Sequence, residues 1–210
     1  MRLLLIRHGE SEGNAERRLQ GRGEYPLSDR GREQARRLAE RLGDEYGGVA
    51  AIYTSSLSRA AETAQILAEV IDAPVIGDDR LREYDVGKLT GLTMEEIRER
   101  FPQVYAAWEK DVEEWVPFPG SEGNEGFDRR VRQVFAEIIA RHGSDENVIV
   151  VSHGGTLGVY LGQIVGLPAG RRSPFAFDNA SLTVVDLSRP RPRLVQHNDT
   201  CHLAGLSFFS

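Results

Sequence analysis

Apolar residues gather in five short runs along the chain, and each run is bounded by polar or turn-forming residues. The runs occupy residues 3–6, 49–53, 148–151, 182–185 and 194–195. They are rich in aliphatic and β-branched side chains, and a short continuous apolar run is typical of a buried strand. The pattern predicts five strands of one sheet. The last two can form a hairpin through the segment SRPRPR.

Between these runs, apolar residues recur every three or four positions, the period of one face of an α-helix. The first such face follows Ser28, a residue type that caps helix N-termini. The three faces are Ala35, Leu38, Ala39 and Leu42; Ala61, Ala64, Leu67, Ala68 and Ile71; and Val131, Val134, Phe135, Ile138 and Ile139. Strands alternating with such helices predict an α/β fold, a three-layer α/β/α sandwich around a largely parallel, mixed sheet.

One stretch departs from this alternation. Residues 92–116 read LTMEEIRERFPQVYAAWEKDVEEWV, and the loop PFPGSEGNEG follows. We expect two short helices, the second opened by Pro102, because proline is accepted in the first turn of a helix. The 210 residues then form a single domain with a small helical lid insertion at about 92–125, packed over one edge of the sheet.

Composition narrows the class of partner and the compartment. With 40% hydrophobic and 28% charged residues, the chain suits an ordinary globular core, and a net charge of −6 argues against nucleic acid or an anionic membrane as partner. The first apolar run is too short for a signal peptide or a membrane span, so we expect a cytoplasmic protein. The single Cys201 excludes an intrachain disulfide, and we expect it to be packed.

Candidate chemistry gathers just after three of the predicted strands. In an open α/β sheet, ligands bind at the carboxyl ends of the strands, where loops and helix N-termini meet. The residues at these ends are Arg7, His8 and Asn14; Ser55, Ser56 and Arg59; and Ser152, His153, Gly154 and Gly155. Arginine forks, an amide donor and accessible backbone N–H groups suit a tetrahedral dianion. Each residue alone also has a structural explanation, so it is their shared placement that favours a phosphate site.

Five motifs in a fixed order carry a family resemblance. They are LLLIRHGES with Asn14, PLSDRGREQA, YTSSLSRAAETA, LREYDVGKLTG and VIVVSHGG. In order and spacing they resemble the histidine phosphatase superfamily, also called phosphoglycerate mutase-like, over most of residues 1–165.

The resemblance implies phosphoryl transfer that needs neither a metal nor a cofactor. It implies that His8 is the nucleophile and forms a phosphohistidine, with its pKa lowered by Arg7 and Arg59. The implied phosphate- and substrate-binding residues are Arg7, Asn14, Gln20, Arg59, His153 and Gly154, with Gln20 the weakest contact. By the same resemblance, Glu83 is the general acid and later the base that activates water. Asp85 is its rival and would point to the opposite face of an extended segment.

The surroundings of this site favour a phosphatase over a mutase. Mutases of the family typically carry a tyrosine before the glycine of the Glu83 motif, where this chain has Val86, and a pair of arginines in the insertion. Here residues 92–116 hold three basic residues against seven acidic ones. We therefore expect hydrolysis of small phosphate monoesters. A cofactor-dependent phosphoglycerate mutase, a non-catalytic phosphate-binding module and a metal-dependent hydrolase are the alternatives.

Several residues near these motifs have two interpretations. The aromatic residues Phe101, Tyr105, Trp108, Trp115 and Phe118 are expected to pack the insertion onto the body, and one or two could line the pocket instead. Arg82 and Lys88 could contact a substrate carboxylate or be solvated. His142, His197 and His202 are expected to be structural, and the alternative for His202 is that it reaches the pocket rim. The expected partner is a small phosphomonoester; a homodimer stays open.

Overall fold

The computed structural model describes residues 1–110, 118–171 and 173–206. In these residues a six-stranded sheet has the order β3-β2-β4-β1-β5-β6. Its strands are β1 (Arg2–Arg7), β2 (Val49–Thr54), β3 (Val75–Gly77), β4 (Asn147–Ser152), β5 (Leu182–Asp186) and β6 (Arg193–Asp199). The first four are mutually parallel, and β5 is antiparallel to β1. The prediction of a largely parallel, mixed sheet is confirmed.

Five of these strands coincide with the predicted apolar runs, and one was missed. Strand β3 lies at the edge of the sheet, and its residues Val75 and Ile76 are each 36% exposed. A search for buried runs cannot detect such a strand. The predicted hairpin is confirmed, because β5 and β6 pair in antiparallel register from Leu182 with Asp199 to Asp186 with Arg193.

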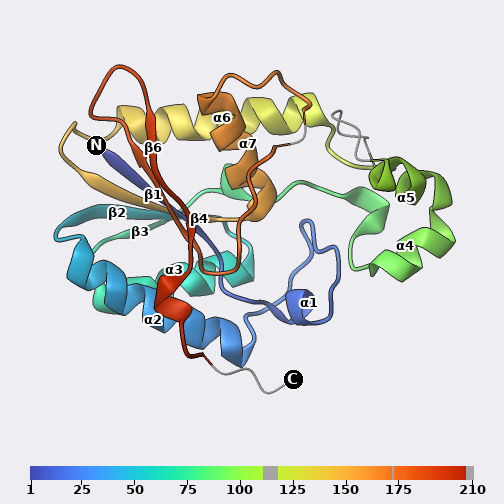
Figure 1. The fold of residues 1–210 in the computed structure, drawn as a ribbon, viewed down its shortest axis with the longest axis horizontal. Helices are drawn as coiled ribbons and strands as arrows, with labels where there is room; N and C mark the ends of the chain where they lie inside the picture. Colours follow the sequence, from blue (N-terminus) through green and yellow to red (C-terminus); the bar gives the residue numbers. More distant parts are fainter. Residues whose placement is uncertain (111–117, 172, 207–210) are drawn as a thin grey trace.

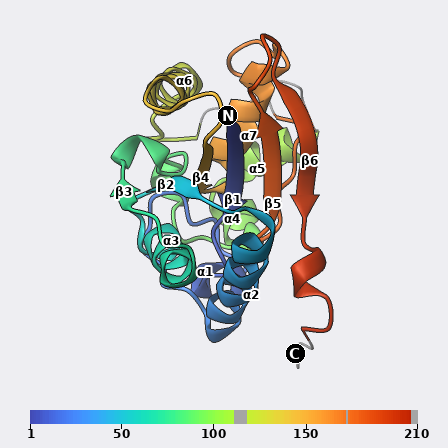
Figure 2. The same ribbon diagram turned by 90° about the vertical axis from the view of Figure 1, so that its left-hand side faces the viewer.

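Helices cover both faces of the sheet (Figures 1 and 2). Helices α2 (Asp29–Glu45) and α3 (Ser58–Val70) lie on one face, and α6 (Asn124–Ala140) and α7 (Gly154–Ile164) lie on the other. This is the predicted three-layer arrangement. The predicted cap of the first helix is also present, since the Ser28 hydroxyl accepts a hydrogen bond from the N–H of Gly31 at 3.0 Å.

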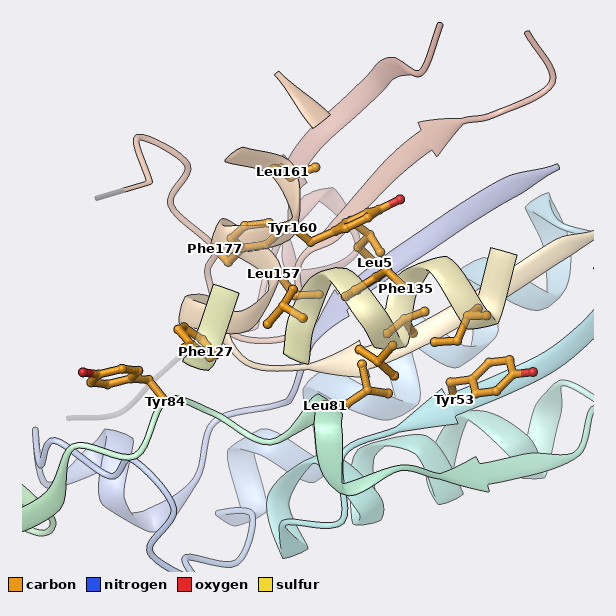
Figure 3. Packing of buried hydrophobic residues seen from close by; sticks show 14 of the residues in the cluster. Leu5, Tyr53, Leu81, Tyr84, Phe127, Phe135, Leu157, Tyr160, Leu161 and Phe177 are labelled. Carbon is orange, nitrogen blue, oxygen red and sulfur yellow. The ribbon is translucent and has the colours of Figure 1, made fainter. Parts of the chain in front are cut away.

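Each face of the sheet builds its own hydrophobic core, because successive side chains of a strand point to opposite faces. In β1, Leu3 and Leu5 pack with α6 and α7, whereas Leu4 and Ile6 pack with α2 and α3. Figure 3 shows Leu5 among the aromatic and aliphatic residues of the first core. There the Phe135 and Tyr160 rings are stacked, with centroids 3.7 Å apart.

The buried face of α3 differs from the predicted one. Its fully buried positions include Ala60, Thr63, Ala64 and Leu67, while Ala61 and Ala68 are only partly buried. The face is rotated because Arg59 and Thr63 point inward together: the Thr63 hydroxyl donates to the carbonyl of Arg59 at 2.7 Å. Polar residues therefore share the inner face of this helix, which an apolar pattern does not reveal.

Two short helices follow the third parallel strand, as predicted. They are α4 (Met94–Arg100) and α5 (Pro102–Glu109), and Pro102 lies in the first turn of α5. They stand beyond the carboxyl ends of the parallel strands, on the side of the short helix α1 (Glu12–Ala15), and not along an edge of the sheet as expected (Figure 1). Trp115 lies outside the described residues.

The remaining short elements are three turns of 3₁₀ helix: η1 (Asp79–Leu81), η2 (Gly87–Leu89) and η3 (Cys201–Leu203). Cys201 is exposed, so the expectation that it packs in the core is wrong; η3 lies on the outside of α2. Among the described helices, none has the length and apolar character that a membrane crossing requires.

Candidate active site

The carboxyl ends of β1, β2 and β4 open onto a cavity of about 320 Å³. All eight predicted site residues line it: Arg7, His8, Asn14, Gln20, Arg59, Glu83, His153 and Gly154. The volume lies in the range of small-molecule pockets. The parallel register explains the convergence, because β1 and β4 pair directly up to Arg7 and Ser152, and the next residues leave the sheet side by side.

His8 is buried and held in one tautomer. Its exposed fraction is 3%, and its Nδ1 lies 2.7 Å from the carbonyl oxygen of Gly9. A carbonyl can only accept, so Nδ1 carries the proton and Nε2 keeps its lone pair. The Nε group of Arg59 donates to this Nε2 at 3.2 Å, which is consistent with the same tautomer. The lone pair of His8 is therefore on Nε2, where it accepts the hydrogen bond from Arg59.

The pKa of His8 lies well below its usual value. Burial is the largest cause, and the positive charges of Arg7 and Arg59 add to it. The expected effect of the two arginines is thus present, although burial is the larger contribution. His8 is neutral at pH 7.

Arg59 is almost fully buried at the start of α3, and the chain after α1 holds its guanidinium. Its two terminal nitrogens each donate to a carbonyl oxygen at 2.8 Å, those of Gly21 and Gly23. Burial lowers its pKa to about 10, so Arg59 remains charged at neutral pH. Gly21 adopts φ +49°, a left-handed conformation that brings its carbonyl toward the arginine.

Two buried donors in the cavity have no hydrogen-bond partner among the described residues: Arg7 Nε and His153 Nδ1. The hydroxyl of Ser55 accepts from the N–H of Leu57 and lies 2.8 Å from His153 Nε2. It can donate its own proton to Nε2, which leaves the proton of His153 on Nδ1. Burial, with the nearby His8 and arginines, lowers the pKa of His153. Unsatisfied buried donors in a polar cavity indicate a site for an acceptor-rich ligand.

Asn14 closes the turn that follows β1. Its Oδ1 accepts from the N–H of Ser11 and from Nδ2 of Asn179, each at 3.2 Å. With Oδ1 satisfied by the protein, the amide nitrogen of Asn14 is the group left to bind a ligand. Gln20 lies beside it, and its Oε1 accepts from the Ser11 hydroxyl at 2.8 Å. A Cβ on Gly13 would meet the Gln20 side chain at 2.8 Å, so a side chain at position 13 would force Gln20 to move.

Asn179 belongs to the site and was missed by the sequence analysis. Its Nδ2 also donates to the carbonyl of His8, at 3.1 Å. Next to it, the N–H of Ala180 bonds to the carbonyls of Arg7 and His8. The available signal was topological: a strand antiparallel to β1 must start beside the end of β1, so the polar residues before Leu182 should meet His8.

Glu83 lies at the rim of the same cavity and is fixed by two backbone donors. Its carboxylate accepts from the N–H of Tyr84 at 2.8 Å and from the N–H of Gly155, at the start of α7, at 2.9 Å. A Cβ at position 155 would lie 2.4 Å from Glu83 Oε1, so any side chain there would displace the Glu83 carboxyl group. The rival Asp85 does not line the cavity and instead accepts from the N–H of Gly87 at 2.9 Å.

A family model of the histidine phosphatase superfamily (branch 1) matches residues 3–200. The chain belongs to this superfamily. It is 38% identical over 214 residues to a metal-independent phosphoserine phosphatase of Arabidopsis thaliana, covering 98% of this chain and 84% of that protein. It is 34% identical over 190 residues to a Serratia proteamaculans protein named as a probable phosphoglycerate mutase, covering 89% and 85%.

Solved structures agree with this assignment. A mycobacterial glucosyl-3-phosphoglycerate phosphatase in complex with VO3 has a TM-score of 0.82 and 34% identity to this chain, covering 94% of this chain and 98% of that one. Together, the family and these relatives support a phosphatase activity.

Three apolar residues, Val86, Trp108 and Phe118, form what we call the outer wall of the cavity. Val86, a residue on which the sequence analysis based its preference for a phosphatase, is buried and lines the cavity. Trp108 from α5 and Phe118 also line it, with ring centroids 5.5 Å apart. Phe101 and Tyr105 pack against the core of the sheet instead. Both interpretations of these aromatics therefore apply, each to different residues.

Arg18 lines the same outer region and was also missed. It directly follows Arg17, a non-glycine residue with φ +57°. Arg18 is not one of the residues for which the resemblance implied a role; the nearest such residues are Asn14 before it and Gln20 after it.

Several candidate residues lie outside the site. Arg82 donates to the Ser56 hydroxyl at 2.7 Å, and neither Arg82 nor Lys88 lines the cavity. His202 does not reach the rim, since its Nε2 lies 3.1 Å from the carbonyl of Ala180 and its ring lies beside Arg41. His142 is at the opposite end of β4, 3.0 Å from the Tyr53 hydroxyl. No cluster of three or more histidine, cysteine, aspartate or glutamate side chains able to hold a metal occurs in the described residues.

Proposed function

We propose that this protein is a metal-independent phosphomonoesterase that hydrolyses small phosphate esters through a phosphohistidine on His8. The observation that carries the proposal is the state of His8: a buried, neutral imidazole whose Nδ1 proton is fixed by Gly9, leaving the Nε2 lone pair in a cavity of cationic donors. A nitrogen nucleophile of this kind needs no metal to be activated. The name of the Arabidopsis relative supports the same reading.

The phosphoryl group binds in the inner half of the cavity. Arg7 Nε and His153 Nδ1, both without a partner, donate to its oxygens. The charge of Arg59 and the amide nitrogen of Asn14 complete the set. These donors are fixed before the ester arrives, so they stabilise the charge that is spread over the equatorial oxygens during transfer without further reorganisation.

The reaction takes place in two displacements. In the first, His8 Nε2 attacks phosphorus, the P–O bond to the alcohol breaks, and Glu83 gives its proton to the leaving oxygen. In the second, water attacks the phosphohistidine and gives a proton to the Glu83 carboxylate. The P–N bond breaks, which releases phosphate and restores neutral His8. The hydrogen bonds from Tyr84 and Gly155 keep the Glu83 carboxyl group in position for both steps.

Hydrolysis is favoured over mutase chemistry by the outer wall. A mutase must keep a second phosphorylated group bound while the first is exchanged. The residues of the outer wall, Val86, Trp108 and Phe118, are uncharged. Among the described lining residues of the same outer region, Arg18 is a single cation instead of an arginine pair. The segment 92–116 adds an excess of acidic residues. The mutase alternative stays in the test because one relative carries that name.

The proposal is tested by p-nitrophenyl phosphate hydrolysis in excess chelator, with the wild type and two variants. We expect wild-type turnover that survives chelation, its loss in His8→Ala by several orders of magnitude, and near wild-type turnover in His142→Gln, which alters a histidine at the far end of β4. Acid-labile, base-stable labelling of the wild type alone would identify the phosphohistidine. Activity that survives in His8→Ala, or that is lost on chelation, contradicts the proposal. Conversion of 3-phosphoglycerate to 2-phosphoglycerate that needs added bisphosphoglycerate would favour the mutase.

A further inference from the structure

Arg18 is a cation of the cavity that the phosphoryl steps do not use. Among the residues lining the cavity, three are arginines: Arg7 and Arg59 lie beside His8, and Arg18 lies in the outer region with Leu19 and Trp108. The outer region is where the alcohol part of an ester must lie once its phosphoryl group faces His8. Arg18 is therefore placed to contact the leaving group.

The end of α1 places Arg18 in this region. The N–H of Arg17 bonds to the carbonyl of Asn14, and the N–H of Arg18 bonds to the carbonyl of Gly13 at 2.8 Å. With Arg17 at φ +57°, this is the Schellman pattern that ends a helix and reverses the chain. The chain then pairs with the segment before α4, where Arg18 forms an antiparallel bridge with Thr93. The position of Arg18 is thus fixed from both sides.

Two of the three guanidinium nitrogens of Arg18 form hydrogen bonds within the described residues, and the third, Nη2, does not. Its Nε donates to Glu16, and its Nη1 donates to the carbonyl of Gly91 at 2.8 Å and lies 3.6 Å from Glu96. In the described part of the chain, Nη2 makes no hydrogen bond, so its two N–H groups remain available. The Glu16 and Glu96 side chains are 56% and 44% exposed, so water screens their charges.

The sign of charge in the cavity points to an anion. Of the described lining residues, Glu83 is the acidic one, and its carboxyl group is held by Tyr84 and Gly155. Among the described lining residues, an ammonium group on the leaving alcohol finds no further carboxylate, whereas a carboxylate finds Arg18. Leu19, Val86 and Trp108 line the same cavity, while the Arg18 side chain is 33% exposed, so water also partly screens a contact made by Arg18.

We propose that Arg18 is a specificity-determining residue that binds a carboxylate on the leaving group, so the preferred substrates are phosphate monoesters of small hydroxy acids. The inference rests on the proposed phosphatase function. It assigns recognition of the anion to the turn after α1 and not to an arginine pair in the segment 92–116, which this chain lacks. The cavity volume of about 320 Å³ limits the ester to a small molecule.

Two esters that differ only in this group provide the test: 3-phosphoglycerate and glycerol 3-phosphate, with p-nitrophenyl phosphate as a reference. We expect the wild type to prefer 3-phosphoglycerate by about tenfold or more in kcat/KM, as a charge-assisted bond predicts. Arg18→Met should reduce this preference to about twofold or less, mainly by raising KM for 3-phosphoglycerate, and keep turnover of the other two esters.

Arg17→Met is the matched control, because it removes the same charge from the neighbouring exposed position and does not touch the cavity. It should keep the wild-type preference. A wild type without preference for 3-phosphoglycerate overturns the proposal, whatever the variants do, and so does an Arg18→Met variant that keeps the preference or loses all three esters equally. Wild-type turnover of p-nitrophenyl phosphate separates these outcomes from a failure of the phosphatase function, which would abolish it.

Discussion

Burial lowers the pKa values of the ionisable groups around His8. Arg7 and Arg59 donate to the backbone carbonyls of Phe177, Gly21 and Gly23 and not to carboxylates of the described residues. Burial lowers the pKa of Arg7, while Glu83 and Asp178 oppose that shift. Two buried cations without paired carboxylates are costly to the fold. Under the proposed function, a bound phosphate dianion would offset that cost by pairing with both cations.

We predict that Asn179 affects ligand binding indirectly, through its hydrogen bond to Asn14. Because its Nδ2 donates to Asn14 Oδ1, it directs the amide nitrogen of Asn14 toward the ligand. Asn179→Asp places a carboxylate beside Asn14, which favours a flip of the Asn14 amide that turns its oxygen toward the phosphoryl group. We expect kcat/KM for p-nitrophenyl phosphate to fall by about tenfold or more, and by less in Asn179→Ala.

A double-mutant cycle checks this role. If Asn179 acts through Asn14, then Asn179→Asp should cost much less in an Asn14→Ala background than in the wild type. Affinity for vanadate should follow the same pattern. Equal costs in both backgrounds would show instead that Asn179 acts only on the backbone of His8.

At the scale of elements, the start of α7 positions the proposed general acid. Helix α7 begins at Gly154, and the N–H of Gly155 binds the Glu83 carboxylate. The loop that carries Glu83 is held from its other side by Arg130 of α6, which donates to the carbonyls of Arg80, Arg82 and Glu83. Two helices on one face of the sheet therefore fix a residue that lies on neither.

Gly155→Ala tests the contact between α7 and Glu83. The new Cβ would lie 2.4 Å from Glu83 Oε1 and must displace it, whereas a Cβ at Gly154 would meet Arg7 at an ordinary 3.9 Å. We expect Gly155→Ala to lower kcat/KM for an alkyl phosphate, which reports the first displacement, by about a hundredfold. The loss should be smaller with p-nitrophenyl phosphate, whose leaving group needs no proton, and smaller in Gly154→Ala. Equal losses on both esters would show that Glu83 is not the acid.

The same elements explain what the sequence could predict. Parallel strands bring their carboxyl ends together, so apolar runs followed by Arg7-His8 and by Ser152-His153 were enough to predict that these residues meet at one cavity. Strand β3 was not predicted because its residues are exposed at the edge of the sheet and so form no buried apolar run. Asn179 and Arg18 were not predicted for another reason. Each is next to a residue with positive φ where the chain reverses, Ala180 and Arg17 respectively, and the positive φ of a non-glycine residue cannot be recognised from the sequence.

At the scale of the whole molecule, the site makes stability depend on pH. Burial lowers the pKa of both His8 and His153 well below 6.5, the usual value that the unfolded chain retains. As pH falls below about 6.5, these histidines bind protons in the unfolded state but not in the folded state, so the free energy of unfolding decreases. The carboxylates of Glu137 and Asp199 have pKa values of about 2, and their stabilisation is lost only at lower pH, as they protonate. The histidines therefore act in the window between about pH 6.5 and 5.

The variant with His8→Gln and His153→Gln isolates this contribution, because glutamine is polar and does not titrate. We expect the wild type to lose more Tm than the double variant between pH 7.5 and 5 in thermal unfolding followed by circular dichroism. The other histidines are the same in both proteins, so their contributions cancel in the comparison. Near-equal losses would mean that His8 and His153 take up protons in the folded state almost as readily as in the unfolded one. In that case His8 would be partly cationic at mildly acidic pH, and hydrolysis should fall off there as well.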